Sequence, residues 1–244
     1  MKTLLSIGLF LISALGLSAA VSNPQSIFEE ANTFYGNGEY TEAIEAYQQL
    51  IPEHQSANIH YNMGNAYYRL GEFGPAILHF EKALALDPRN PDIRANLELT
   101  QEAAEVIPTS HSWANGLSDR FSANTWAWLA VTSFWASLGL IILAPLYRWR
   151  GPMRGGVTSL ALVVLVVSCI GLYGWHVRAG YGVVLSDDAR LSVAPTSSSP
   201  AAGTVKAGEM AKITQSHGDY YLVRIGSDKV GWLPKAQFSP VWDS

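Results

Sequence analysis

Two long apolar runs limit what this chain can fold into more than any other feature. They cover residues 126–146 and 157–175, and neither contains Asp, Glu, Lys or Arg. Each is close to the roughly 20 residues that an α-helix needs to cross the hydrocarbon core of a bilayer. We therefore expect two transmembrane helices, with a buried helical hairpin of a soluble protein as the alternative. Because the runs carry no charged side chain, nothing in them indicates a transport or proton path.

The residues around the two runs indicate their orientation. Residues 147–155 contain three arginines and no acidic residue, so the positive-inside rule places this loop in the cytoplasm and both flanking parts of the chain outside it. Aromatic residues lie at the ends of the runs, as in the interfacial belts of membrane proteins. These residues are Trp126, Trp128, Tyr147, Trp149, Tyr173 and Trp175.

The N-terminus agrees with this topology. Lys2 precedes an apolar stretch over residues 4–17, and Ser18, Ala19 and Ala20 follow it. This order is typical of a secretory signal peptide, which we expect over residues 1–20 with cleavage after Ala20. The alternative is an uncleaved anchor. Together these patterns predict a two-pass inner-membrane protein whose soluble domains both lie on the periplasmic side.

The charge distribution excludes several classes of function. The net charge is −4, but residues 21–105 carry thirteen acidic and four basic residues, a local net charge of −9. Residues 179–244 carry six of each sign, so no basic stripe is present for nucleic acid. The single cysteine, Cys169, lies in the second apolar run, which excludes an intramolecular disulfide and a thiolate metal site.

Residues 24–56 and 57–90 are related to each other as internal repeats. Five pairs recur at an offset of 33 residues, which is the spacing of stacked helix pairs. The pairs are Gly38/Gly71, Tyr40/Phe73, Ala43/Ala76, Ile44/Ile77 and Tyr47/Phe80. Residues 91–106 begin like a third copy, but no partner helix follows before Pro108, so we expect a capping helix. Since repeat arrays usually need about three units, the module over 24–106 should gain stability from a partner or from the membrane-proximal segment.

The second copy resembles a tetratricopeptide repeat, with Gly64, Ala76 and Ala83 at its small positions and Pro88 after its second helix. The resemblance implies a concave groove lined by the first helix of each pair and used to bind protein partners. Carried over by position, the groove residues are Phe28, Asn32, Tyr35, Tyr61, Asn65, Tyr68 and Arg69. Amides and aromatic rings suit an extended peptide, and the acidic field favours a neutral or basic one. Alternatively, Tyr35 and Tyr68 only pack between the helices.

Residues 107–123 are rich in Ser, Asn, Gly and Pro and are expected to form a linker. Residues 180–242 alternate short β-favouring runs with turns, and we expect about five strands. Their order resembles bacterial SH3-like domains, with Tyr220 or Tyr221 in place of the usual tryptophan. Trp232 is expected in the core of a small barrel, with a ligand contact as the alternative. The predicted fold class is a multi-domain membrane protein with an α-helical repeat module, a two-helix transmembrane hairpin and a small all-β SH3-like barrel.

No arrangement typical of an enzyme or a cofactor site is present in the sequence. The six histidines are scattered, and none is paired at the i, i+4 spacing of a helical zinc site. There is no phosphate loop and no nucleophile elbow, and the adjacent acids Glu29-Glu30 and Asp187-Asp188 are typical of a solvated surface. We therefore expect no enzymatic activity, no metal and no cofactor.

The order of the parts resembles the BatE-type proteins of bacterial aerotolerance operons. That resemblance implies an envelope complex with other Bat proteins, including partners with von Willebrand-type domains, and a role in stress or oxygen tolerance. The first hypothesis is thus an adaptor that is held in membrane lipid and grips a protein partner with its repeats. The second is an envelope sensor or anchor whose β-domain binds cell-wall peptide. A third, an undetected hydrolase, lacks a candidate nucleophile or cleft acid.

Overall fold

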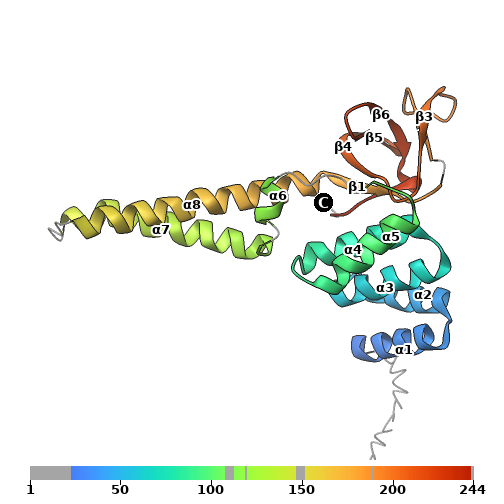
Figure 1. Ribbon diagram of the computed structural model, residues 1–244, viewed down its shortest axis with the longest axis horizontal. Helices are drawn as coiled ribbons and strands as arrows, with labels where there is room; N and C mark the ends of the chain where they lie inside the picture. The colour runs from blue at the N-terminus through green and yellow to red at the C-terminus, as the bar shows by residue number, and fades with distance from the viewer. Residues whose placement is uncertain (1–22, 108–112, 119, 147–151, 188, 243–244) are drawn as a thin grey trace, which may run out of the picture.

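The computed structural model describes residues 23–107, 113–118, 120–146, 152–187 and 189–242. The expected signal peptide lies outside these residues. Figure 1 shows three parts: a stack of helices at the N-terminal end, a long helix pair, and a β-domain at the C-terminal end. The stack and the β-domain lie side by side at the same end of the helix pair (Figure 1).

The N-terminal stack consists of two helix pairs and one further helix. These are α1 (Pro24–Asn37), α2 (Tyr40–Leu50), α3 (Ala57–Leu70), α4 (Phe73–Leu86) and α5 (Pro91–Ala103). Each of α1, α3 and α5 begins at a side-chain cap, in which a short polar residue accepts a backbone N–H that the helix leaves unpaired. The caps are Asn23, Ser56 and Asn90.

Glycines end the first helix of each pair. Gly38 has φ +84° and Gly71 has φ +78°, a left-handed conformation that a residue with a Cβ adopts only at a cost. Each glycine and the residue after it donate backbone N–H groups to carbonyls of the last helical turn, which satisfies those carbonyls and turns the chain into the next helix. The recurrence of these glycines therefore fixes the helix–turn–helix shape of both repeats.

The interior of each repeat is filled by the residues that recur in the sequence. Ala43, Ile44 and Tyr47 are buried in the first pair, and their counterparts Ala76, Ile77 and Phe80 are buried in the second. At Gly64 a Cβ would lie 2.7 Å from the Phe80 ring, so α3 and α4 approach each other closely only because this residue is glycine.

The long helix pair follows a short helix, α6 (Trp113–Ser118), which falls within the expected linker. The pair consists of α7 (Ala123–Leu146) and α8 (Pro152–Ala179), and both helices are long and apolar enough to span a membrane. Ser133, Ser137 and Ser168 are buried, and each hydroxyl donates to a carbonyl of its own helix. Such small residues let membrane helices pack closely.

The β-domain is a single curled antiparallel sheet, a half-barrel consistent with a small SH3-like domain (Figure 1). Its strands are β1 (Tyr181–Val184), β2 (Ala189–Ser192), β3 (Ala201–Val205), β4 (Met210–His217), β5 (Tyr220–Ile225), β6 (Lys229–Pro234) and β7 (Phe238–Pro240). They pair in the order β3-β2-β6-β5-β4-β1-β7. Bulges in the β2–β3 and β4–β5 pairs increase the local twist and help the sheet to curl.

The β-domain differs from the sequence prediction in two respects. Strands β3 and β7 were not expected, because β3 is built of small residues and β7 is three residues long; each forms by pairing with a neighbour, β2 or β1. The prediction that Trp232 is a core residue is wrong. It is only partly buried, and Leu233 and Phe238 fill the interior instead, since alternation along β6 directs neighbouring residues to opposite faces.

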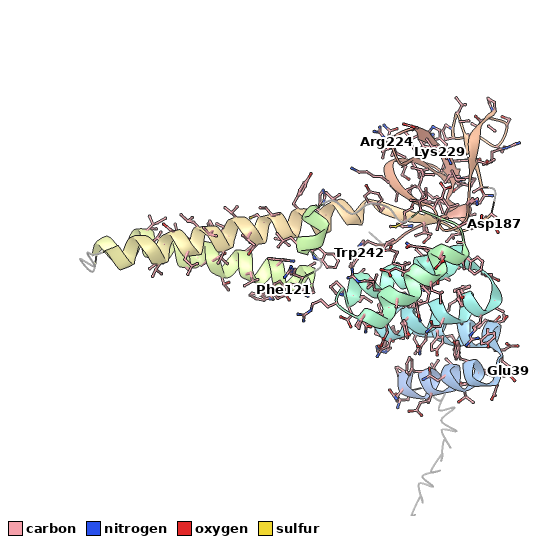
Figure 2. The ribbon with its side chains drawn as sticks, in the orientation of Figure 1. Glu39, Phe121, Asp187, Arg224, Lys229 and Trp242 are labelled. Atoms are coloured by element: carbon pink, nitrogen blue, oxygen red, sulfur yellow. The ribbon has the colours of Figure 1, made fainter. Side chains whose placement is uncertain are left out.

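The repeat module and the β-domain share one hydrophobic core. Ile77 of α4, Val106 after α5, and Val183 of β1 belong to the same buried cluster, and Trp242 packs against it. In Figure 2 Trp242 is labelled where the β-domain faces the helices. The outer face of the second repeat is thus covered by another part of the same chain.

Candidate functional site

The seven residues expected to line the groove all lie on α1 and α3. None of them is buried, so none is reserved for the core: Phe28, Tyr35, Tyr61, Asn65 and Tyr68 are partly exposed, and Asn32 and Arg69 are exposed. Hydrogen bonds connect this set across α1, α3 and α5, the first helices of the successive units. The set therefore forms one continuous face, which we call the groove face.

A polar cluster links α1, α2 and α3 on the groove face. Asn32 Oδ1 accepts a hydrogen bond from the Tyr47 hydroxyl at 2.5 Å and another from Asn62 Nδ2 at 3.0 Å. Asn62 Nδ2 also donates to the Tyr47 hydroxyl oxygen at 3.2 Å. Burial raises the pKa of Tyr47, which keeps its phenol protonated and able to donate.

The asparagine–asparagine bond recurs one repeat later, between α3 and α5, with a tyrosine from a different position of the repeat beside it. Asn96 Nδ2 donates to Asn65 Oδ1 at 2.8 Å and to the Tyr61 hydroxyl at 3.0 Å. Asn65 is the counterpart of Asn32, and Asn96 is the counterpart of Asn62 one unit on. Sequence reasoning missed Asn62 and Asn96 as groove residues, although their recurrence in the repeat was a signal that could have identified them.

These bonds hold the amide groups of Asn32 and Asn65 through their oxygen atoms, and they do not use the Nδ2 donors. Among the described residues, Asn32 and Asn65 accept through Oδ1, and no hydrogen bond from either Nδ2 group is present. A primary amide held in this way can donate to the carbonyl of a bound backbone. The chemistry of the groove face is therefore suited to an extended peptide.

Two tyrosines of the groove face pack against neighbouring rings and remain partly exposed to solvent. Tyr35 meets the Tyr40 ring edge-on at 5.4 Å between centroids, and Tyr68 lies 6.0 Å from Phe73. Arg69 is hydrogen-bonded to Tyr35, which raises the pKa of the guanidinium. The two interpretations of Tyr35 and Tyr68, packing and contact, are thus compatible, because each ring is anchored yet partly exposed.

A hollow lies at the N-terminal end of the stack, between the start of α1 and the turn from α2 to α3. Its volume is about 510 Å³. Apolar Phe28, Leu50 and Ile59 line it together with polar His54 and Asn58. A hollow with such a lining can receive one apolar side chain of a bound segment.

The structure also brings together two histidines that the sequence leaves 19 residues apart. His60 of α3 and His79 of α4 are both buried, and their Nδ1 atoms lie 3.0 Å apart. One ring donates to the other, which requires that the accepting nitrogen is unprotonated. Burial, followed by the proximity of His60, lowers the pKa of His79 to about 3. Tyr67 stacks on His79 at 5.4 Å, so the pair is a structural element of the repeat.

Comparison with known families supports this description of the helices. Residues 57–90 match the family described as Tetratricopeptide repeat, and residues 31–71 match the family described as TPR repeat. The helical module is built of tetratricopeptide repeats. No curated protein matched the chain. Tetratricopeptide repeats are non-catalytic modules for binding proteins, and within the described residues no three His, Cys, Asp or Glu side chains are gathered as metal ligands.

Proposed function

We propose that this protein is a membrane-anchored adaptor of the bacterial envelope. In this proposal its tetratricopeptide repeats bind an extended, neutral or basic segment of a protein partner along the groove face. The observation that carries it is the repeated asparagine–asparagine bond, which joins α1 to α3 and α3 to α5, the first helices of successive units, and holds their amides beside partly exposed aromatic rings.

The charge of the repeat module supports the type of partner. The repeat module lies in residues 21–105, which carry thirteen acidic and four basic residues, so the electrostatic field around the module favours cationic segments over acidic ones. Arg69 is the one basic residue of the seven predicted groove residues, and it is engaged with Tyr35. A carboxylate clamp, which needs several free cations, has little support.

The helix pair supports the membrane anchor. Several large apolar side chains of α7 and α8 are strongly exposed, which in water would be a large apolar patch of the kind that soluble proteins avoid. Examples are Trp135, Leu160 and Val163, at 64%, 64% and 57% exposed. The position of both soluble parts at one end of the pair fits the topology that the arginine-rich loop predicts, with both parts on the periplasmic side of the inner membrane (Figure 1).

The proposed setting is a Bat-type complex linked to stress or oxygen tolerance. Its support is the order of parts along the chain: repeats, paired apolar helices and a β-domain. In that setting the partner segment belongs to another membrane protein of the complex, such as one with a von Willebrand-type domain.

Site-specific photo-crosslinking in cells tests the adaptor. A photoreactive side chain replaces Tyr68 on the groove face, and a control chain carries it at Glu45, which is exposed on α2. The adaptor predicts a cross-linked membrane protein at position 68 only. Asn65→Ala should reduce that product at least tenfold, whereas Gln49→Ala, exposed on α2, should not. Equal products at both positions, or none at position 68, would overturn the proposal.

The second candidate, a sensor or anchor that binds cell-wall peptide, is favoured by one observation. Trp232 is partly exposed on the β-domain, where its ring meets His217 edge-on at 6.3 Å, and Lys235 lies 5.0 Å above the Tyr221 ring. If the β-domain is the binding part, Trp232→Ala abolishes binding to purified cell wall while cross-linking at position 68 is absent or unchanged. The adaptor predicts the opposite result: cross-linking at position 68 occurs, and it is reduced by Asn65→Ala but not by Trp232→Ala.

A further inference from the structure

Three arginines from two distant parts of the chain meet around one pocket. The pocket has a volume of about 560 Å³ and lies between α5 and the segment after α6. Arg89 and Arg94 line it from the repeat module, and Arg120 lines it from the membrane-proximal turn; among the described residues of its lining, Glu98 is the one acidic residue. The described lining therefore carries an excess of positive charge.

This concentration is unusual in its surroundings. Residues 21–105 contain only four basic residues among thirteen acidic ones, and two of the four line this pocket. The Arg94 guanidinium donates to the Pro88 carbonyl at 3.0 Å, which holds it at the rim. In the described part of the chain none of the three arginines forms an ion pair. Like charges that converge in this way favour an anion between them.

Hydrogen bonds from two tryptophans fix the position of the pocket along the axis of the helix pair. Trp126, near the start of α7, and Trp175, near the end of α8, both donate from Nε1 to the Ser118 carbonyl at 3.1 Å. Trp175 Nε1 also reaches the Phe121 carbonyl at 3.2 Å. The turn that contains Arg120 is thus fastened to the same ends of both helices, and Figure 2 shows Phe121 at that junction.

Tryptophans at the ends of membrane helices lie in the headgroup layer. If α7 and α8 span the membrane, as the proposed function requires, Arg120 lies at the level of the lipid phosphates. Arginine binds phosphate oxygens through two parallel N–H groups, so three arginines suit a phosphate group. The volume is large enough for a phosphate with part of its glycerol.

We propose that this pocket binds the phosphate of an anionic phospholipid headgroup. The bound headgroup links the repeat module to the membrane surface, so that the module is held at a fixed height above the bilayer. This inference rests on the membrane anchor in the proposed function but not on the peptide partner.

Native mass spectrometry of the full chain in detergent tests the site. Phosphatidylglycerol should bind at least about tenfold more tightly than phosphatidylcholine, because a charge-assisted contact typically changes affinity by that factor. Arg89→Gln with Arg120→Gln should remove the preference, because two of the three arginines of the pocket are lost. Both side chains are exposed, so the change does not disturb a core. The control, Arg190→Gln with Arg224→Gln, removes the same charge from the β-domain, where Figure 2 labels Arg224, and should keep the preference.

The possible results distinguish a lipid site from a general anion site and from a failed membrane anchor. No preference for phosphatidylglycerol, or equal loss in the control, overturns the site. If inorganic phosphate stays bound to the chain in the native mass spectra and phosphatidylglycerol does not, the pocket is an anion site and the lipid assignment is overturned. Carbonate extraction of membranes is measured in parallel: if the chain is extracted as a soluble protein, the proposed anchor fails, whereas an integral protein without lipid preference refutes only the pocket.

Discussion

Gly74 is the residue at which the joint between the repeat module and the β-domain is tightest. It lies in the first turn of α4, against β1 and the residue that follows it. A Cβ at this position would lie 2.6 Å from the Leu185 carbonyl oxygen and 2.8 Å from that of Val184. Both neighbours are backbone atoms of a strand end, so they cannot move aside as a flexible side chain does. Gly74→Ala should therefore force the two parts of the chain away from each other.

Two terms are involved, and only one of them changes the balance between the closed and open arrangements. Alanine favours a helix over glycine by up to about 1 kcal/mol, but α4 is helical in both arrangements, so this gain cancels. Overpacking a close contact usually costs about 1–3 kcal/mol, and here the contact is with backbone. The lower part of that range, about 1–2 kcal/mol, corresponds to roughly a 5- to 30-fold increase in the open population.

Thiol labelling measures that population directly. Val183 of β1 is fully buried in the shared core, and Val183→Cys places a thiol there in a chain whose own cysteine has been removed by Cys169→Ser. Gly74→Ala should increase the labelling rate of this thiol by roughly 5- to 30-fold. Gly36→Ala is the matched control, because Gly36 is also helical but has open space around its Cβ position. It should leave the rate unchanged.

An unchanged or slower labelling rate in the Gly74→Ala chain would refute the reasoning. The close contact of Gly74 with Val184 and Leu185 would then be absent, which means that α4 and β1 are not packed together in solution.

Three further predictions concern buried contacts within the repeat module and between α7 and α8. Because burial lowers the pKa of His79 to about 3, below the 6.5 of an exposed histidine, the unfolded state binds more protons than the native state between these values. The free energy of unfolding should thus fall as the pH decreases through 6.5, with a slope that approaches roughly 1 kcal/mol per pH unit below it, and thermal melting of His60→Leu with His79→Leu should lose this slope. Gly64→Ala should lower the unfolding free energy of the repeats by about 1–3 kcal/mol, measured by denaturant titration, since its Cβ would meet a buried ring. Gly171→Ala should loosen the α7–α8 pair, because a Cβ at this position would overlap the Trp126 ring; unchanged cross-linking between cysteines on the two helices would contradict this.

Much of the helical module could be predicted because its signals are local. The recurring glycines, the small residues between paired helices and the proline after α4 determine turns and close contacts within one repeat. The candidate groove residues came from the resemblance to tetratricopeptide repeats, which assigned them to the first helix of each pair, and they lie on α1 and α3. Their hydrogen bonds could not be predicted in this way, because Asn62 and Asn96 act across repeats, at 30 and 31 residues from Asn32 and Asn65.

The β-domain was harder to predict because its strands depend on partners. Strand β3 lacks the branched and aromatic residues that favour strands, and β7 is shorter than any reliable pattern. The burial of a residue in such a sheet depends on which face it occupies, and a shift of one residue reverses it. Trp232 shows this, since its neighbour Leu233 is fully buried while the tryptophan is not.

The sequence by itself determined the parts of this protein and their order: tetratricopeptide repeats, two helices able to span a membrane, and a small β-domain. These depend on periodicity, length and apolar composition, which are properties of contiguous segments. Only the tertiary structure decided how the parts meet. The β-domain covers the outer face of the second repeat at α4. Gly180 alone connects α8 to β1, and Arg120 lies with Arg89 and Arg94 around one pocket. These contacts link residues that are far apart in the chain, and no local pattern encodes them.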